Sequence, residues 1–218
     1  MRKAPKSNVA IKVEMKNHII FEAVLGNRKI PTTTMIFNMG SATTCPSDKL
    51  GLCPMGGMNG DGSCYALKAE CGIYPATLPY RHRQEDMWLN SSAENIAHAI
   101  NNTIKKRPYI DAIRVNESGD FHSMDCVKKL SRVASLVNVP VYSYTHRLDL
   151  FTEATTKKLH KNLTMNFSEE MSFNHSHNEF RVEDTVDGAT DSVPCAMDCK
   201  MCSLCVTRTQ RVITVPKH

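Results

Sequence analysis

Cysteine is the residue type with the clearest chemical meaning in this sequence of 218 residues, which contains 9 of them. No signal peptide is expected, because Lys12 and Glu14 interrupt the apolar residues near the start. In a reducing compartment cysteines seldom form disulfides, so metal binding or redox chemistry is the expected use. Apart from Cys126, they form a first group of Cys45, Cys53, Cys64 and Cys71 and a second group of Cys195, Cys199, Cys202 and Cys205.

The second group reads CAMDCKMCSLC, a CxxxCxxCxxC pattern. One short loop with this spacing can present several thiolates to one centre, and soft thiolate sulfur suits an iron–sulfur cluster or zinc. Zinc sites more often use two CxxC pairs separated by a longer segment. The overlapping short spacings therefore favour [4Fe-4S] ligation by Cys195, Cys199, Cys202 and Cys205, with zinc as the alternative.

The first group is more widely spaced, and the prolines and glycines between its cysteines prevent a regular helix or strand. Ordering such a loop costs about 1 to 2 kcal/mol of backbone entropy per residue. A metal that draws in several thiolates offsets this cost. We therefore expect Cys45, Cys53 and Cys64 to be metal ligands, whereas Cys71 also fits a small core residue. The alternative is a flexible insertion with structural cysteines.

Three other residues of metal-binding type are expected to have ordinary roles. Cys126 lies in the helical pattern of 123–138, two positions from its apolar stripe, which favours a packing or surface position. His175 and His177 lie in a segment of weak pattern, which favours a polar loop over a metal site.

The segments around the cysteines alternate between strand and helix. Strands are predicted within 32–40, 112–115, 139–147 and 162–170, and helices within 91–106, 123–138 and 151–161. Such alternation favours a parallel sheet with right-handed crossovers, although the units are too few for a complete eight-stranded barrel. The predicted fold is α/β, a partial barrel or open mostly parallel sheet with cysteine-rich loops. Residues 1–218 are expected to form one cluster-binding domain, with a cysteine-rich loop at 45–71 and a cysteine segment at 195–205.

In such sheets ligands bind beyond the carboxyl ends of the strands. The first predicted strand leads directly into Cys45, and later ones lead into polar segments, so both should lie on one face. A plain turn at 116–121 and a solvated strand end at 146–147 are the alternatives. The candidates to line a pocket for a small-molecule ligand are Glu117, Ser118, Asp120, Tyr144, Thr145 and His146.

Several segments together resemble the phage protein family called gene product 88. They are TTCP at 43–46, CYA at 64–66, IRVNESGDFHS at 113–123, VPVYSYTHR at 139–147 and the closing CxxCxxC at 199–205. The resemblance covers roughly residues 25–205. It implies a cysteine-rich, cluster-binding protein of undetermined activity, located in the host cytoplasm.

The same segments are more distantly similar to radical S-adenosylmethionine proteins, partial α/β barrels in which CxxxCxxC ligates three irons of a [4Fe-4S] cluster. There the third cysteine is commonly next to an aromatic residue, as Cys64 is next to Tyr65. The similarity therefore implies Tyr65 as a cofactor-binding residue and S-adenosylmethionine as a cosubstrate. In this sequence the first group is stretched, and the compact CxxxCxxC occurs at the far end.

Two functions follow from these patterns. One is radical-type chemistry at the strand ends, with one or two [4Fe-4S] clusters. The other is a non-catalytic cluster or zinc protein that binds a host protein or nucleic acid, which the net charge of +5 permits without requiring. No stretch has the roughly 20 consecutive apolar residues that cross a bilayer, so a cytoplasmic protein without a membrane partner is expected.

Overall fold

The computed structural model describes residues 8–183 and 192–216. They form a nine-stranded sheet with the order β1-β2-β3-β4-β5-β6-β7-β9-β8. β1, β2 and β3 pair antiparallel, and every neighbouring pair from β3 onwards is parallel. The strands are β1 (Val9–Glu14), β2 (Ile20–Leu25), β3 (Thr34–Phe37), β4 (Ala112–Val115), β5 (Val141–Thr145), β6 (Leu163–Phe167), β7 (Asn178–Glu183), β8 (Ser192–Pro194) and β9 (Val212–Pro216).

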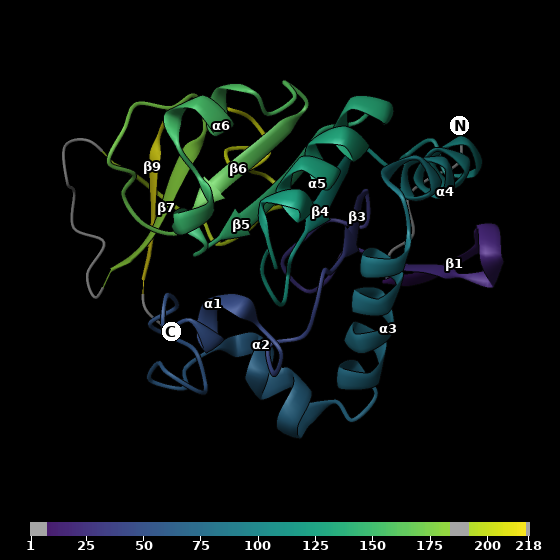
Figure 1. The fold of residues 1–218 in the computed structure, drawn as a ribbon, viewed down its shortest axis with the longest axis horizontal. Coiled ribbons are helices and arrows are strands. Elements are labelled where there is room, and N and C mark those ends of the chain that lie inside the picture. The colour runs from purple at the N-terminus through teal and green to yellow at the C-terminus, as the bar shows by residue number, and fades with distance from the viewer. Residues whose placement is uncertain (1–7, 184–191, 217–218) are drawn as a thin grey trace.

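The helices follow the strands in the order expected for parallel crossovers (Figure 1). They are α1 (Pro46–Lys49), α2 (Tyr65–Lys68), the π-helical turn η2 (Ala69–Ile73), α3 (Thr77–Asn90), α4 (Ala93–Lys106), α5 (Met124–Leu136) and α6 (Glu153–Lys157), with short 3-10 turns η1 (Lys16–His18) and η3 (Leu148–Leu150). No helix in the described ranges has the length and apolar character needed to cross a bilayer.

One face of the sheet packs on α4 and α5 and forms the apolar core. Ile100 of α4 and Leu130 of α5 are fully enclosed, together with Ile113, Met165 and Phe167 of the sheet. Side chains alternate along a strand, so the residues between these point to the opposite face. That second face carries Arg114, Tyr142, Tyr144, Thr164, Asn166 and Asn178.

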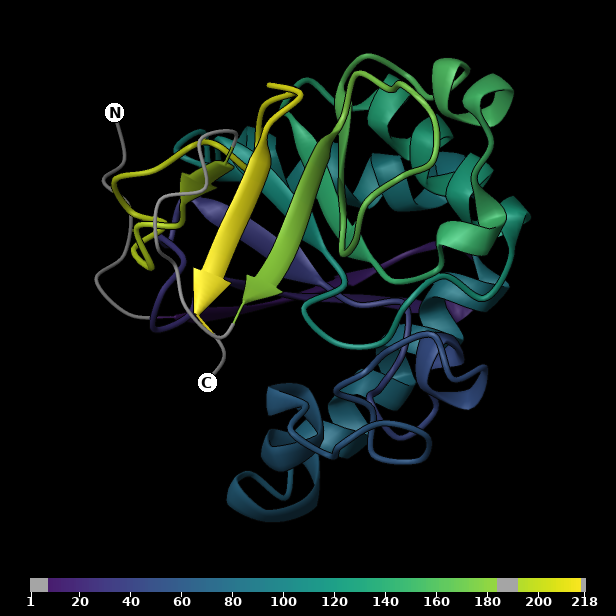
Figure 2. The same cartoon turned by 90° about the vertical axis from the view of Figure 1, so that its left-hand side faces the viewer.

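The carboxyl-terminal segment covers this second face. Asn178 donates to the carbonyls of Leu204 and Thr207 at 3.1 and 2.9 Å, and its own carbonyl accepts from the Thr209 backbone N–H at 2.9 Å. Asn166 donates to the Cys205 carbonyl at 3.0 Å. Figure 2 shows this segment on the side of the sheet opposite the helices. The polar second face therefore has a defined partner within the chain.

The predicted fold class is confirmed: the protein is α/β with an open, mostly parallel sheet. The helix predicted within 91–106 has Ser92 as its N-cap, which accepts from the Asn95 backbone N–H at 3.2 Å. No strand was predicted between 171 and 194, where the structure has β7 and β8; residues 184–191 lie outside the described ranges. The assignment of residues 1–218 to one domain stays a prediction.

Replacement of Asn178 by alanine should loosen the segment that carries the second cysteine group. Asn178 is fully buried, and its loss leaves two carbonyls and the Thr209 N–H unpaired. We expect local opening to become easier by about 3 kcal/mol. This corresponds to about 100-fold faster hydrogen exchange at the Thr209 amide.

The matched control is Asn90→Ala, which removes a side-chain bond to the Asp86 carbonyl on an exposed helix end. It should change stability by no more than about 0.5 kcal/mol. Equal exchange at Thr209 in both variants would show that Asn178 does not hold the segment.

Candidate metal centre

The first cysteine group lies at the carboxyl end of β3. Cys45 is the N-cap residue of α1, Cys64 is the N-cap residue of α2, and Cys53 lies in the turn between them. In Figure 2 this segment lies beyond the arrowheads of the parallel strands. The expectation that the strand leads directly into Cys45, at the edge where ligands bind in such sheets, therefore fits the structure.

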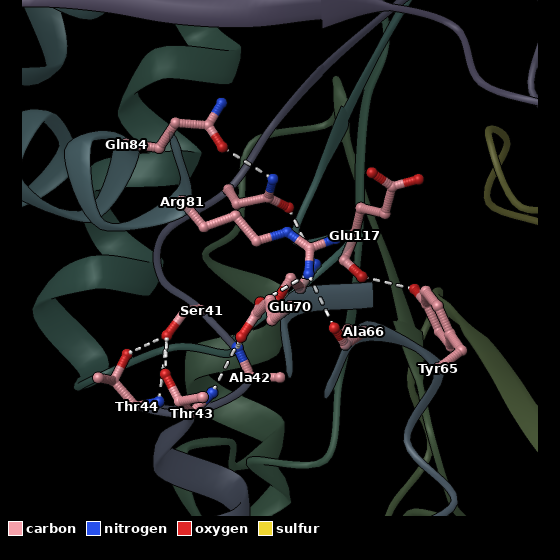
Figure 3. Close-up of polar contacts among 12 residues, drawn as sticks. Ser41, Ala42, Thr43, Thr44, Tyr65, Ala66, Glu70, Arg81, Gln84 and Glu117 are labelled. Atoms are coloured by element: carbon pink, nitrogen blue, oxygen red, sulfur yellow. Dashed lines mark hydrogen bonds and ion pairs between the residues drawn. The ribbon is translucent and has the colours of Figure 1, made fainter. Parts of the chain in front are cut away.

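A buried carboxylate, Glu70, fixes the start of this segment (Figure 3). It accepts from the Ala42 backbone N–H at 2.9 Å and from the Thr43 N–H at 3.2 Å. It also forms an ion pair with Arg81 of α3 at 2.6 Å and accepts from the Ser118 hydroxyl at 2.8 Å. Glu70 thus connects three parts of the fold: α3, the end of β4 and the segment 41–70, which carries Cys45, Cys53 and Cys64 and is called the first cysteine segment below.

Asp48 holds the glycine-rich turn in the same way. Its carboxylate accepts from the backbone N–H groups of Gly57, Met58 and Asn59 at 2.9 to 3.1 Å. A Cβ at Gly56 would come within 2.1 Å of Asp48 Oδ1, so the close approach requires glycine there. The turn between Cys53 and Cys64 is therefore ordered around a carboxylate.

The thiols of the first group have backbone donors directed at their sulfur atoms. The N–H groups of Ser47 and Asp48 donate to Cys45, and that of Met55 donates to Cys53. Burial nevertheless raises the pKa of these thiols, and with a smaller contribution from the charge of Asp120 it reaches about 12 for Cys45 and about 11 for Cys53. These thiols are protonated at neutral pH unless a metal replaces the proton.

The second group is held against the second face of the sheet between β8 and β9. The Met197 N–H contacts Cys195 Sγ at 3.5 Å, which repeats the donor arrangement of Cys53 two residues before Met55. The Tyr144 hydroxyl donates to the Cys205 sulfur. Burial raises the pKa of Cys205 to about 12 despite this bond. Burial also raises the pKa of Cys199.

Each thiol is influenced by the charge of other cysteines in its own group. Cys53 raises the pKa of Cys45, and Cys64 raises that of Cys53. Cys195, Cys199 and Cys202 raise the pKa of Cys205. Within the described ranges, however, no three His, Cys, Asp or Glu side chains form a ready-made metal site. Metal binding by the seven predicted cysteine ligands therefore stays a prediction.

The strand-end candidates lie close together, but most are used within the protein. Asp120 accepts from the Ser47 and Thr145 hydroxyls at 2.5 and 2.6 Å and from the His146 N–H at 2.8 Å. The Ser118 N–H donates to Asn38 at 2.9 Å, and its hydroxyl bonds to Glu70. These side chains hold the first cysteine segment against β4 and β5. A direct role for them in binding a cofactor stays a prediction.

Tyr65, Glu117 and Tyr144 lie nearer the second face. The Tyr65 hydroxyl donates to the Glu117 carbonyl at 2.5 Å, as Figure 3 shows, although more than half of Tyr65 is exposed. The Glu117 carboxylate accepts from the Asn27 side chain. Tyr144 contacts Phe180 edge-on at 5.0 Å between ring centroids. All three residues lie close enough to Arg114 to influence its charge.

His146 also lines a cavity of about 470 Å³ at the carboxyl ends of β5, β6 and β7. Met55 of the first cysteine segment, Ser168, Glu169 and Arg181 form other parts of its wall. Burial lowers the pKa of His146, and its Nδ1 is enclosed with no hydrogen-bond partner among the described residues. This cavity gives the strand-end face room for a small molecule next to Cys53.

The remaining cysteines and histidines have separate environments. Cys71 is exposed on η2, and Cys126 packs in the apolar core of α5, as expected for a packing residue. His177 lies in the loop that precedes β7, as predicted, but it is fully buried and accepts from the Met165 N–H at 3.1 Å. Burial lowers its pKa to about 3 because Phe167 and its surroundings exclude water. His175 packs on Phe167 as well, at 5.0 Å between ring centroids.

Sequence reasoning did not identify Glu70, Asp48 or Arg114. The two carboxylates act on backbone groups that are brought to them by folding, so no local spacing marks them. Arg114 had a usable signal, because a charged residue stands inside the otherwise apolar strand Ala112–Val115.

Replacement of Glu70 by glutamine should destabilise the first cysteine segment. It removes the charge that pairs with the buried Arg81 and turns amide hydrogens toward the Ala42 and Thr43 N–H groups. We expect the free energy of unfolding to fall by about 3 to 5 kcal/mol. Protease cleavage within 41–70 should become faster, and urea denaturation measures the loss.

Glu94→Gln is the matched control, because Glu94 pairs with Arg132 on the surface, where both side chains are more than half exposed. Its loss should be no more than about 1 kcal/mol. If Glu70→Gln were as mild as this control, Glu70 would not anchor the segment.

Comparison with known proteins gave one informative match. The family model described as "Gene product 88" matches residues 6–205. No curated protein and no solved structure matches the chain. The matched range includes both cysteine groups and all of β1 to β8. The chain therefore belongs to the phage gene product 88 family.

Proposed function

We propose that this protein binds iron–sulfur clusters through its two groups of cysteines. The observation that carries the proposal is a repeated arrangement in which a backbone N–H donates to a cysteine sulfur two residues earlier. The Met197 N–H lies 3.5 Å from the Cys195 sulfur, and the backbone groups of Ser47 and Met55 lower the pKa of Cys45 and Cys53 in the same way. Hydrogen bonds to sulfur are among the features that set the properties of iron–sulfur centres.

The acid–base properties of the thiols support a metal as the missing partner. Burial keeps the thiols of Cys45, Cys53 and Cys205 protonated at neutral pH, whereas the donors around them favour thiolates. A metal resolves this conflict because a coordinating thiol loses its proton. The side chains of each group would need to close around the metal, because the sulfur atoms are not gathered as a finished site.

Iron is favoured over zinc by the spacing of the second group. The CxxxCxxCxxC pattern resembles cluster ligation more than the paired CxxC of structural zinc. The first group offers Cys45, Cys53 and Cys64, and the second offers Cys195, Cys199, Cys202 and Cys205. Zinc in the same positions is the alternative.

Protein prepared without oxygen should contain about four iron and four sulfide per cluster, with a broad visible absorption. Double replacement of Cys199 and Cys202 by alanine should remove the iron held by the second group. Replacement of Cys45 and Cys53 should remove that of the first. Cys71→Ala is the control, because Cys71 is exposed and lies on η2.

The metal analysis separates the alternatives. If the protein contains zinc and no sulfide, the cysteines bind zinc and not an iron–sulfur cluster. Absence of both metals from folded protein, or equal iron in the Cys199/Cys202 variant and the Cys71 control, would contradict the proposal.

A second candidate function is radical-type chemistry at the first group, and the adjacent cavity favours it. Three cysteines would leave part of a cluster without a protein ligand, as an open catalytic metal requires. The cavity wall includes Met55, which follows Cys53 closely, and His146. S-adenosylmethionine bound here would accept an electron from the cluster. The non-catalytic alternative is a cluster protein that binds a host protein or nucleic acid.

If the first group is catalytic, the reduced protein should convert S-adenosylmethionine to 5′-deoxyadenosine and methionine in an anaerobic assay. The Cys45→Ala/Cys53→Ala variant should form neither product, while the Cys71→Ala control should retain activity. Product formation that does not differ between the parent and the Cys45/Cys53 variant would exclude this chemistry and leave the non-catalytic alternative.

A further inference from the structure

Arg114 is a cation on the second face of the sheet, and its guanidinium lies over the ring of Tyr144. It lies in β4 between Ile113 and Val115, both of which are fully buried. Its Nε is enclosed and has no hydrogen-bond partner within 8–183 and 192–216, and its guanidinium forms no ion pair with the carboxylates of these ranges. Arg114 itself is half-buried, and a partly enclosed charge that has no ion-pair partner favours an anion nearby.

The described residues around Arg114 supply only part of the compensating charge. The guanidinium lies 4.9 Å from the centroid of the Tyr144 ring, a cation–π contact with a neutral side chain. Burial raises the pKa of Tyr142 and Tyr144, so both phenols stay protonated at neutral pH. The Glu117 carboxylate is close enough for its charge to act on Arg114, but it accepts a hydrogen bond from Asn27 and forms no ion pair with the guanidinium.

The second cysteine group lies against the same patch. Asn166 fixes the Cys205 carbonyl at 3.0 Å, and the Tyr144 hydroxyl donates to the Cys205 sulfur. The charge of Arg114 acts on Cys199 and opposes the effect of burial on that thiol. The cysteines are neutral when they carry protons, but they become an anionic centre when a metal takes the protons' place.

We propose that Arg114 is the counter-cation of the metal–thiolate centre formed by Cys195, Cys199, Cys202 and Cys205, and that Tyr144 is a hydrogen-bond donor to its sulfur. This inference rests on the proposed cluster binding. A cluster with thiolate ligands is negatively charged and becomes more so on reduction. A nearby cation and a hydrogen bond to sulfur stabilise the reduced form more than the oxidised form. Arg114 and Tyr144 therefore raise the reduction potential.

The test uses the full chain with Cys45→Ala and Cys53→Ala, so that the second centre is observed alone. Arg114→Gln, Arg114→Lys and Tyr144→Phe are compared in this background after anaerobic purification. Iron content is measured first, followed by a redox titration monitored by visible absorption and electron paramagnetic resonance. Arg114→Gln should shift the potential to a more negative value. Arg114→Lys should shift it less, and Tyr144→Phe should also make it more negative.

Arg132→Gln is the matched control, because it removes the same charge from α5, where the Arg132 side chain is 57% exposed and pairs with Glu94. Its potential should not change. An unchanged potential in Arg114→Gln with iron retained would overturn this inference and leave the cluster proposal intact. Should Arg114→Gln fail to fold, unchanged potentials in both Arg114→Lys and Tyr144→Phe would overturn it equally.

The metal content distinguishes the remaining outcomes. Parent protein without metal would overturn both the cluster proposal and this inference. If the centre holds zinc, the same variants are compared for the rate of zinc release to a chelator. Arg114→Gln should then release zinc several-fold faster, and equal rates for Arg114→Gln and Arg132→Gln would contradict the role of Arg114.

Discussion

A fully buried asparagine pair determines where the carboxyl-terminal cysteines lie. Parallel pairing of β6 and β7 places Asn166 and Asn178 side by side, and Asn178 donates to the Asn166 carbonyl oxygen at 3.1 Å. Buried amides must find hydrogen-bond partners, and the carbonyls of 204–207 supply them. The segment with the second cysteine group is thus part of the interior of the fold. The buried amides of the second face need the carbonyls of this segment as acceptors, and the segment is held in place by the same hydrogen bonds.

The first cysteine segment is held by a different device, a set of buried carboxylates. Glu70, Asp48 and Asp120 each accept several hydrogen bonds, mostly from backbone N–H groups. The entropy argument from the sequence assigned the ordering of this glycine-rich loop to a metal. The structure shows that carboxylates provide much of it. A metal at Cys45, Cys53 and Cys64 would then mainly draw the thiols together, on a backbone that is already positioned.

The sequence was most informative where local pattern and tertiary environment agree. The strand at Ala112–Val115 was predicted with the bounds that the structure has, because a buried apolar run ends in a glycine turn. Helix α3 was missed because it buries Arg81 and Gln84, which read as surface residues until their partners from distant segments are known. β7 was missed for a similar reason, since its Asn178 is buried by hydrogen bonds to the carboxyl-terminal segment. The cysteine groups could be recognised by spacing, but the residues that position them could not.

Two separate centres are more consistent with these frameworks than one shared cluster. The first group is tied to α3 and to the ends of β4 and β5 through Glu70 and Asp120, whereas the second is tied to β6 and β7 through Asn166 and Asn178. A shared cluster would need thiols from both frameworks to meet at one point, whereas two centres can form with each framework as it stands. Under the proposed cluster binding, the second of two such centres would lie on the face of the sheet that carries Arg114.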